Sequence, residues 1–171
     1  AKDQLFPLGL AYNIKNTLKY NAISEIEFDY PKSKDNLSTT DFAYDYLQGK
    51  MLIEIKDVGW YAIHTADETL TGAVPTKHIT AFSLESEMLS RRMTGFTGTF
   101  QFATLLQAVL DMIPTWTHGS IDLALLPLYR TFTSNNSTVY NFLVTDVEKA
   151  YGCVFIFDTD AKTVSVTTNI I

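Results

Sequence analysis

Two aspartates near the end of the chain, Asp158 and Asp160, have the type and spacing to do chemistry. They could bind a calcium ion or act as an acid–base pair. A calcium loop of the EF-hand type would continue with another oxygen ligand, a glycine and a glutamate, but Lys162 and Thr163 follow and no glutamate comes after them. Glycosidase carboxylates face each other across a cleft, about 5–9 Å apart, and neighbours in a short turn would not. Because an aspartate side chain accepts hydrogen bonds from the backbone of its own turn, the stretch predicts a hairpin turn.

A second group, His118, Ser120 and Asp122, contains the residue types of a hydrolytic triad. A triad needs its base, nucleophile and acid to converge in space, and closeness along the sequence does not establish that. Ser120 is also outside any G-x-S-x-G turn of the kind that presents a nucleophile. We therefore predict a loop after Pro114, with Trp116 packed on the core.

The histidines and the cysteine give no metal or redox site. His64, His78 and His118 do not share the spacing of metal ligands. Cys153 is the only cysteine, which leaves no disulfide and no cysteine-based zinc site within one chain. The sequence thus predicts no catalytic, cofactor-binding or metal-binding residue, and no cofactor.

The composition is that of an ordinary folded protein of 171 residues, with 46% apolar and 13% aromatic residues. Lys and Arg total 13 against 19 Asp and Glu, which gives a net charge of −6. Because the basic residues are scattered, we expect no sequence-specific nucleic acid partner. No apolar run approaches the roughly 20 residues of a membrane span, so we expect no membrane insertion. The chain begins with Ala1 and not with methionine, which favours a fragment of a longer protein.

The first part of the chain predicts strands. Residues 25–30 alternate apolar and acidic side chains, which is typical of a half-buried strand, and Pro31 ends it. Residues 41–49 predict a short helix that ends at Gly49. Residues 50–68 predict a β-hairpin.

The best candidate for a domain boundary is the segment 69–76, which contains Gly72 and Pro75. We predict a β-rich, barrel-like but incomplete subdomain over 1–72 and an α+β subdomain over 73–171. The predicted fold class is therefore α+β: a β-rich partial barrel followed by a small domain with two helices and a terminal β-hairpin.

Both helices are predicted in the second part. Apolar residues at helical spacing indicate one helix over 104–114, stopped by its final proline. A longer helix is indicated over 136–152, with Asn136 or Ser137 as its N-cap and Gly152 at its end.

Strands surround these helices. Residues 77–85 begin as an extended segment that turns helical, and 98–103 and 128–133 predict strands. Residues 153–157 are apolar on both faces and predict a central strand, whereas 163–167 alternate and predict a strand nearer an edge. With the aspartate turn between them, these last two strands form the terminal hairpin.

Several stretches, taken in order, resemble phage minor tail proteins of the tail-associated lysin, or prophage endopeptidase tail, family. The opening strands match in LGLAYNIKNTLKYNAISEIEFDYP (8–31), and GWYAIHTADE (59–68) fits the strand that follows. HITAFSLESEMLSRRM (78–93) and GTFQF (98–102) fit the next segment, and the strongest match covers 113–166. Within it, the residues in the family's order are Pro114, Trp116, Gly119, Arg130, Thr131, Phe132, Tyr140, Phe142, Leu143, Phe157, Asp158 and Thr159.

This resemblance, which covers most of the chain, implies a structural role. It implies a fragment of the hub that caps the tail tube of long-tailed phages, at the tail tip or baseplate of the virion, encoded by a prophage and made in the bacterial cytoplasm. It also implies a homotrimer in the intact protein, with the distal tail protein and the tail tube and tape-measure proteins as partners. Any lytic domain would lie further along the parent protein, so no catalytic residue of the family is carried over and the fragment is expected not to be an enzyme.

Two other functions stay open on the sequence alone. One is a cell-wall hydrolase, a tail-associated endopeptidase, with His118, Asp122 or Asp158 as candidate residues. The other is a carbohydrate-binding module that uses Trp60 or Trp116.

Overall fold

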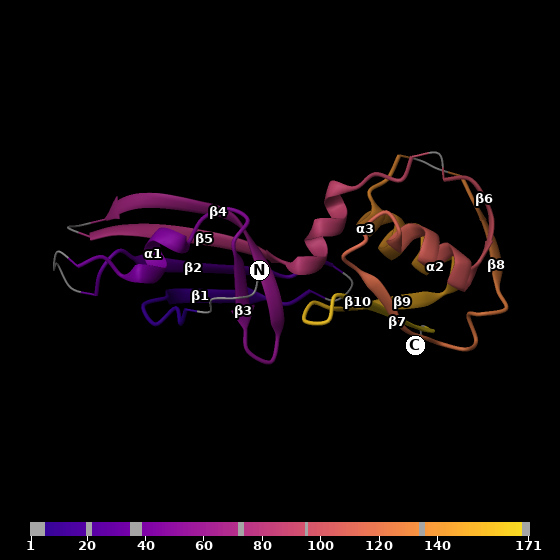
Figure 1. Ribbon diagram of the computed structural model, residues 1–171, viewed down its shortest axis with the longest axis horizontal. Helices are drawn as coiled ribbons and strands as arrows, with labels where there is room; N and C mark the ends of the chain where they lie inside the picture. The colour runs from indigo at the N-terminus through magenta and orange to yellow at the C-terminus, as the bar shows by residue number, and fades with distance from the viewer. Residues whose placement is uncertain are drawn as a thin grey trace. The chain divides into compact units, whose positions relative to one another are not determined.

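The computed structural model of the chain divides into two compact units at the junction between Ser83 and Leu84 (Figure 1). Unit 1, before the junction, is rich in strands, and unit 2, after it, combines strands with helices. The α+β fold class predicted from the sequence is confirmed. The residues that the structure describes are 6–19, 22–34, 39–71, 74–94, 96–133 and 136–168.

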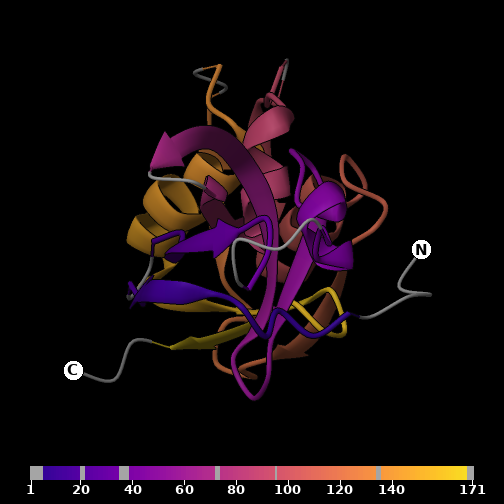
Figure 2. The ribbon, with the colours of Figure 1, turned by 90° about the vertical axis from the view of Figure 1, so that its left-hand side faces the viewer.

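Unit 1 is built on a curled antiparallel sheet that forms a half-barrel (Figures 1 and 2). Within the described residues its strands are β1 (Tyr12–Thr17), β2 (Glu25–Pro31), β3 (Leu52–Ile55), β4 (Gly59–Thr71) and β5 (Val74–Ser83). Their order is β1-β2-β5-β4-β3, so β1 and β3 are the two edges among the described strands. The predicted partial barrel is confirmed, and so is the hairpin predicted for 50–68, which β3 and β4 form.

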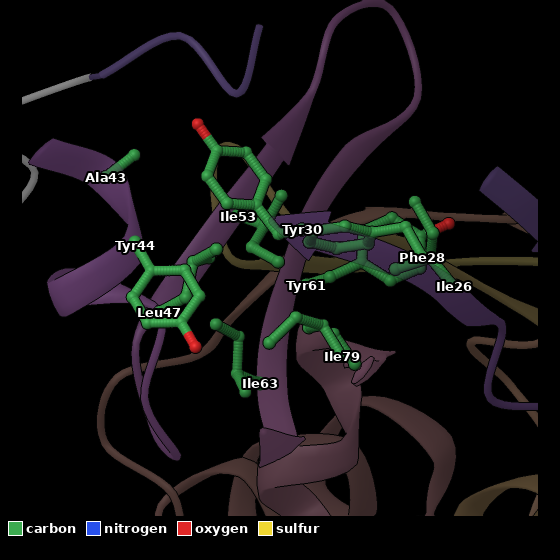
Figure 3. Packing of buried hydrophobic residues seen from close by; sticks show 11 residues of the cluster. Ile26, Phe28, Tyr30, Ala43, Tyr44, Leu47, Ile53, Tyr61, Ile63 and Ile79 are labelled. Atoms are coloured by element: carbon green, nitrogen blue, oxygen red, sulfur yellow. The ribbon is translucent and has the colours of Figure 1, made fainter. Parts of the chain in front are cut away.

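Alternation along β2 places its apolar side chains on one face of the sheet. Ile26, Phe28 and Tyr30 are buried, and the acidic residues between them are only half-buried. On the neighbouring strand β5, Ile79 lies opposite Phe28 and is 0% exposed. These side chains form the core of unit 1 together with helix α1 (Phe42–Tyr46) (Figure 3). The half-buried strand predicted for 25–30 is confirmed.

Asp41 joins the N-terminus of α1 to the sheet. Its Oδ1 atom accepts the backbone N–H of Ala43 at 3.0 Å, which caps the helix. The same atom accepts the hydroxyl of Tyr30 at 2.8 Å. Burial, and then the hydrogen bond to this carboxylate, raise the pKa of Tyr30 to about 12, so the hydroxyl keeps its proton and donates a hydrogen bond to Asp41.

Lys77 of β5 holds the other end of α1. Its ammonium group donates to the carbonyl oxygens of Tyr44 at 2.7 Å and Leu47 at 3.0 Å. The prediction that the helix ends at Gly49 is wrong, because the last helical residue is Tyr46. A lysine from the sheet satisfies carbonyls that a terminal glycine motif would otherwise serve.

The boundary between the units lies later than the sequence predicted. The prediction separated 1–72 from 73–171, and residues 72–73 are outside the described residues. β4 and β5 pair on both sides of them, with Leu70 opposite Pro75. Because β5 then also pairs with β2, the compact unit continues to Ser83. Pro75 therefore belongs to a strand pair and not to a linker.

Unit 2 begins with a 3₁₀ helix and ends with a hairpin. Its elements, within the described residues, are η1 (Leu84–Ser90), β6 (Gly98–Gln101), α2 (Phe102–Leu110), β7 (Thr117–Ile121), β8 (Tyr129–Phe132), α3 (Val139–Asn141), η2 (Phe142–Val147), α4 (Glu148–Tyr151), β9 (Cys153–Asp158) and β10 (Thr163–Thr168). The strands form two small sheets, β7-β10-β9 and β6-β8, among the described residues. Among the described residues of both units, no helix is long and apolar enough to cross a membrane.

Helix α2 confirms the helix predicted over 104–114, with different ends. It begins at Phe102 and ends at Leu110, before Pro114 is reached. The backbone N–H of Ile113 bonds the carbonyl of Leu110 at 2.8 Å, and this i to i−3 bond tightens the chain after the last α-helical turn. Ile113 stays buried, at 6% exposed, although it lies beyond the helix.

The second predicted helix is one run of α3, η2 and α4. Gly152 ends it with a φ of 65°, as predicted. The predicted N-caps, Asn136 and Ser137, are wrong by one residue or two. Thr138 is the N-cap, and its Oγ1 atom accepts the backbone N–H of Asn141 at 3.3 Å.

The middle of this run, η2, is a π-helical stretch, which changes the buried face. A π-helix closes its hydrogen bonds five residues apart and so shifts the side chains that follow. Phe142 is only 3% exposed, whereas Val144, two residues later, is half-buried.

The strand positions in the terminal sheet reverse the prediction. Among the described strands, β10 is central and β9 lies at an edge, because β7 pairs in parallel with β10. The sequence predicts a loop for the residues of β7, so this third strand is not anticipated. The apolar character of β9 reflects the burial of Cys153, Val154 and Phe155, and burial does not require a neighbour on both sides.

Candidate functional site

The aspartate pair is a turn, as the sequence predicts. Asp158 Oδ1 accepts the backbone N–H groups of Asp160 and Ala161, each at 2.9 Å. This is the bonding expected of an aspartate that opens a turn. The side chain is thus used to connect β9 to β10.

The residues of the possible triad serve the sheet. His118 and Ser120 lie on β7, so the predicted loop is wrong. Asp122 Oδ2 accepts the hydroxyl of Thr168 at 2.6 Å, and its Oδ1 accepts the backbone N–H of Ala124 at 3.0 Å. These bonds, that of Thr168 first, lower the pKa of the Asp122 carboxyl. Asp122 fastens the end of β7 to the end of β10, while His118 Nδ1 lies 3.2 Å from the carbonyl oxygen of Gly119.

The histidines have separate surroundings. In unit 1, the ring of His64 packs against Phe82, with centroids 5.3 Å apart, and His78 Nδ1 lies 2.8 Å from Asp29 Oδ1. His118 belongs to unit 2. Among the described residues, no three side chains of the metal-binding types gather at one place.

The tryptophans considered for sugar binding are both buried. Trp60 is 6% exposed and Trp116 is 2% exposed. The Trp116 ring packs against Phe157, and its Nε1–H donates to Glu87 at 3.3 Å. Stacking on a sugar needs an open ring face, and these rings are occupied by protein contacts.

Glu87 also binds the turn that Asp158 opens. Its carboxylate lies 2.9 Å from the ammonium of Lys162. Glu87 of η1 therefore holds both Trp116 and the β9–β10 turn in place. No local sequence pattern indicates this pair, because Glu87 and Lys162 are far apart in the chain.

Gly119 lies where two strands approach closely. A Cβ atom on it would collide with Ser165 Oγ. The same oxygen accepts the backbone N–H of Ser120 at 3.2 Å. The glycine that the family resemblance includes is explained by the close approach of β7 and β10.

Arg130, another residue of the resemblance, closes the long helix. Its Nε–H donates to the carbonyl oxygen of Ala150 at 2.7 Å, and its guanidinium lies 5.5 Å from the ring of Tyr151. Phe132 on the same strand packs against Phe142, at 5.2 Å between ring centroids. These residues of the resemblance thus hold unit 2 together, so the resemblance reflects the structural framework of the fold.

The surface of the half-barrel carries the features best suited to binding. Exposed apolar residues occur on or beside both edge strands, and no sequence pattern singled them out. β1 has Tyr12 and Ile14, at 44% and 61% exposed, and Leu18 just beyond it at 65%. Beside or on β3, Met51 is 45% and Leu52 is 40% exposed.

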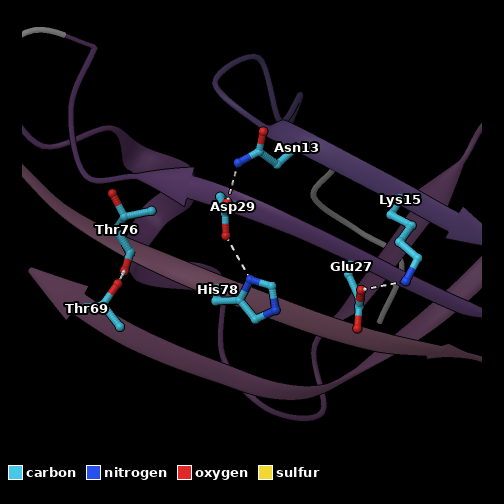
Figure 4. A network of polar contacts seen from close by, with 7 residues as sticks. All are labelled: Asn13, Lys15, Glu27, Asp29, Thr69, Thr76 and His78. Carbon is cyan, nitrogen blue, oxygen red and sulfur yellow. Dashed lines mark hydrogen bonds and ion pairs between the residues drawn. The ribbon is translucent and has the colours of Figure 1, made fainter. Parts of the chain in front are cut away.

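A polar network holds β1 against the rest of the sheet (Figure 4). Asn13, with a φ of 52°, lies where the register of β1 shifts, and its Nδ2–H donates to Asp29 Oδ2 at 2.8 Å. The bond from His78, and then that from Asn13, lower the pKa of Asp29. Lys15 pairs with Glu27 at 3.5 Å. The edge strand is therefore fixed in place with apolar side chains in water.

The fold of the chain is the fold of known tail proteins from prophages and bacteria. Prophage tail protein gp18 from Listeria monocytogenes matches with a TM-score of 0.67 and 15% identity, over 94% of this chain and 46% of that one. A tail protein from Neisseria meningitidis matches with a TM-score of 0.59 and 13% identity, over 92% and 45%. The 43 kDa tail protein of prophage MuSo2 from Shewanella oneidensis matches with a TM-score of 0.55 and 12% identity, over 85% and 46%.

The chain spans slightly less than half the length of each of these structures. At such identities the likeness is one of fold. No protein-family model matches the sequence, and no curated protein matches it significantly.

Proposed function

We propose that the chain is a structural part of a phage or prophage tail, within the hub at the tail tip or baseplate. The observation that carries the proposal is the shared fold with prophage tail proteins, which extends over 94% of the chain for gp18. The ordered resemblance in sequence supports the same assignment. The side chains weighed for catalysis serve the fold, as Asp122 and Asp158 do, and we assign the chain no catalytic role.

The half-barrel supports assembly with other subunits. An edge strand has unpaired N–H and C=O groups, and natural proteins protect or use them. β1 and β3 are both edges among the described strands, and both expose apolar side chains. Two different edges on one subunit favour head-to-tail contacts, which close into a ring where the rotation between subunits allows it. A homotrimer in the intact protein fits this arrangement.

The proposed partners follow from the position in the tail. The hub would contact the distal tail protein and the tail tube and tape-measure proteins. Exposed apolar residues at fixed strand edges suit such permanent contacts, because obligate interfaces are rich in apolar area.

Two measurements test the proposal on the intact parent protein. Mass spectrometry of purified phage particles should detect peptides of this chain, in a fixed ratio to the other tail proteins. Light scattering of the parent should give three times its monomer mass. Ile14→Lys on the edge strand β1 should reduce that mass. Glu54→Lys on β3 makes the same test of the second edge. Absence of the chain from infectious particles would refute the tail assignment, and a stable monomeric parent would refute the trimer.

A further inference from the structure

The free edge of β9 in unit 2 is a surface that the proposed assembly does not use. β9 pairs only with β10 among the described strands. Its residues 153–157 have no charge, no proline and no glycine. Such a segment at an open edge is a template for pairing with another strand.

The ladder shows which backbone groups face this edge. Phe155 lies opposite Val166, and the carbonyl of Val166 accepts the N–H of Asp122 on the far side of β10. The N–H and C=O of one strand residue point to the same side, so Phe155 and Val166 turn their groups away from each other. Phe155 therefore presents its backbone groups to the open edge, as do Cys153 and Phe157, each two residues away.

Glu148 occupies the middle of this edge. Its Oε1 atom accepts the backbone N–H of Phe155 at 3.1 Å. Burial raises the pKa of the Glu148 carboxyl, and the bond from Phe155 opposes that rise. The half-buried carboxylate is thus partly removed from water while it accepts the central donor of the edge, the one that an incoming strand would need.

We infer that Glu148 guards β9 against pairing with the β9 of a second copy of this chain. A second copy of this chain is the partner expected at this edge, because the segment 153–157 is complementary to itself. In an antiparallel pair centred on Phe155, each Phe155 exchanges N–H and C=O bonds with the other. Ile156, which is 55% exposed, then lies opposite Val154 of the second copy and buries apolar surface. The inference does not depend on the proposed tail function.

Glu148→Ala removes the carboxylate that occupies the N–H of Phe155. Lys149→Ala, at an exposed position on the same helix, is the matched control. Sedimentation velocity over a concentration series measures the self-association of each chain. Glu148→Ala should self-associate at least about tenfold more tightly than the unchanged chain. A tenfold change corresponds to about 1.4 kcal/mol, and a hydrogen bond to a charged group is typically worth more than that. Lys149→Ala should match the unchanged chain.

Ile156→Lys shows whether the association passes through β9. A lysine on an edge strand opposes pairing with another strand. The double variant of Glu148→Ala with Ile156→Lys should return to the association of the unchanged chain. A folded Glu148→Ala that sediments like the unchanged chain would overturn the inference, and so would a double variant that still associates.

A pH series keeps the test decisive if Glu148→Ala does not fold. Protonation weakens Glu148 as an acceptor, so self-association of the unchanged chain should rise as the pH falls through the raised pKa of this carboxyl. Among the described residues, Tyr140 and Cys153 feel the charge of Glu148, and burial raises the pKa of each to about 12, so both stay neutral. The charge of Glu85 also reaches Tyr140. Glu148→Gln keeps an acceptor oxygen and should lack the rise. An equal rise in both chains would overturn the inference.

Discussion

Gly119→Ala should destabilise unit 2 through one defined collision. The new Cβ atom would overlap Ser165 Oγ, whereas the Cβ atom of Ser165 is 3.6 Å away, an ordinary contact distance. The φ of Gly119 is not in the left-handed region, so alanine adds no backbone strain. Rotating the Ser165 hydroxyl aside would break its bond to the N–H of Ser120.

The magnitude follows from these two contributions. Overpacking costs about 1–3 kcal/mol, and a lost hydrogen bond costs about 1 kcal/mol. We expect Gly119→Ala to lower the free energy of unfolding of unit 2 by about 2–4 kcal/mol. Chemical denaturation followed by the fluorescence of Trp116 measures this, in a Trp60→Phe background shared by every variant, so that the signal reports unit 2.

A double-mutant cycle separates the collision from a general effect of the substitution. Ser165→Ala removes the hydroxyl and keeps the Cβ atom. In that background Gly119→Ala should cost less than about 0.5 kcal/mol, as changes without a defined structural mechanism do. An equal loss of stability in both backgrounds would refute the reasoning.

Other predictions concern the turn, the helix cap and the polar network. Asp158→Ala should lower the free energy of unfolding by about 1 kcal/mol through lost turn bonds, and mass spectrometry should find no bound metal in either form; stoichiometric calcium would contradict this. Asp41→Ala should cost about 1–2 kcal/mol in thermal or chemical unfolding, since the helix cap and the partner of Tyr30 are lost together; a loss that Tyr30→Phe does not share in part would argue against the link. The folded-state pKa of Asp29 is lowered from its ordinary 3.8, so the unfolded chain binds more protons in acid and stability should fall as the pH drops below about 4. Asp29→Asn should flatten this part of a plot of unfolding free energy against pH, and an unchanged slope would contradict the role of the His78 bond.

Local patterns in the sequence predicted what local contacts decide. The alternation of 25–30, the stop at Gly152 and the turn at Asp158 depend on residues within a few positions, and the structure confirms each. The prediction for the C-terminal end of α1 failed because that end depends on Lys77, which lies far along the chain on another strand. A long-range contact of this kind leaves no local signal.

The terminal sheet shows a second reason for failure. The polar residues of β7 have little strand character, and Gly119 is there because of the close approach of β10. The apolar run of β9 predicts burial correctly in Val154 and Phe155. Burial and the number of neighbouring strands are separate properties, so the composition of β9 could not give its place in the sheet.

The candidate surface was less predictable than the fold. Exposed residues such as Ile14 and Leu18 have the same apolar type as core residues. Only the topology shows that they lie at or beside an edge. The expectation of a structural role came from the resemblance to phage tail proteins and not from any local pattern at this surface.

Electron microscopy of intact phage particles labelled with gold-tagged antibody to this chain tests the central claim most directly. The tail-hub assignment predicts gold at the tail end farthest from the capsid, and loss of that label when the chain is deleted from the prophage. Gold on the capsid or along the tail shaft, or tail tips that assemble normally without the chain, would contradict it.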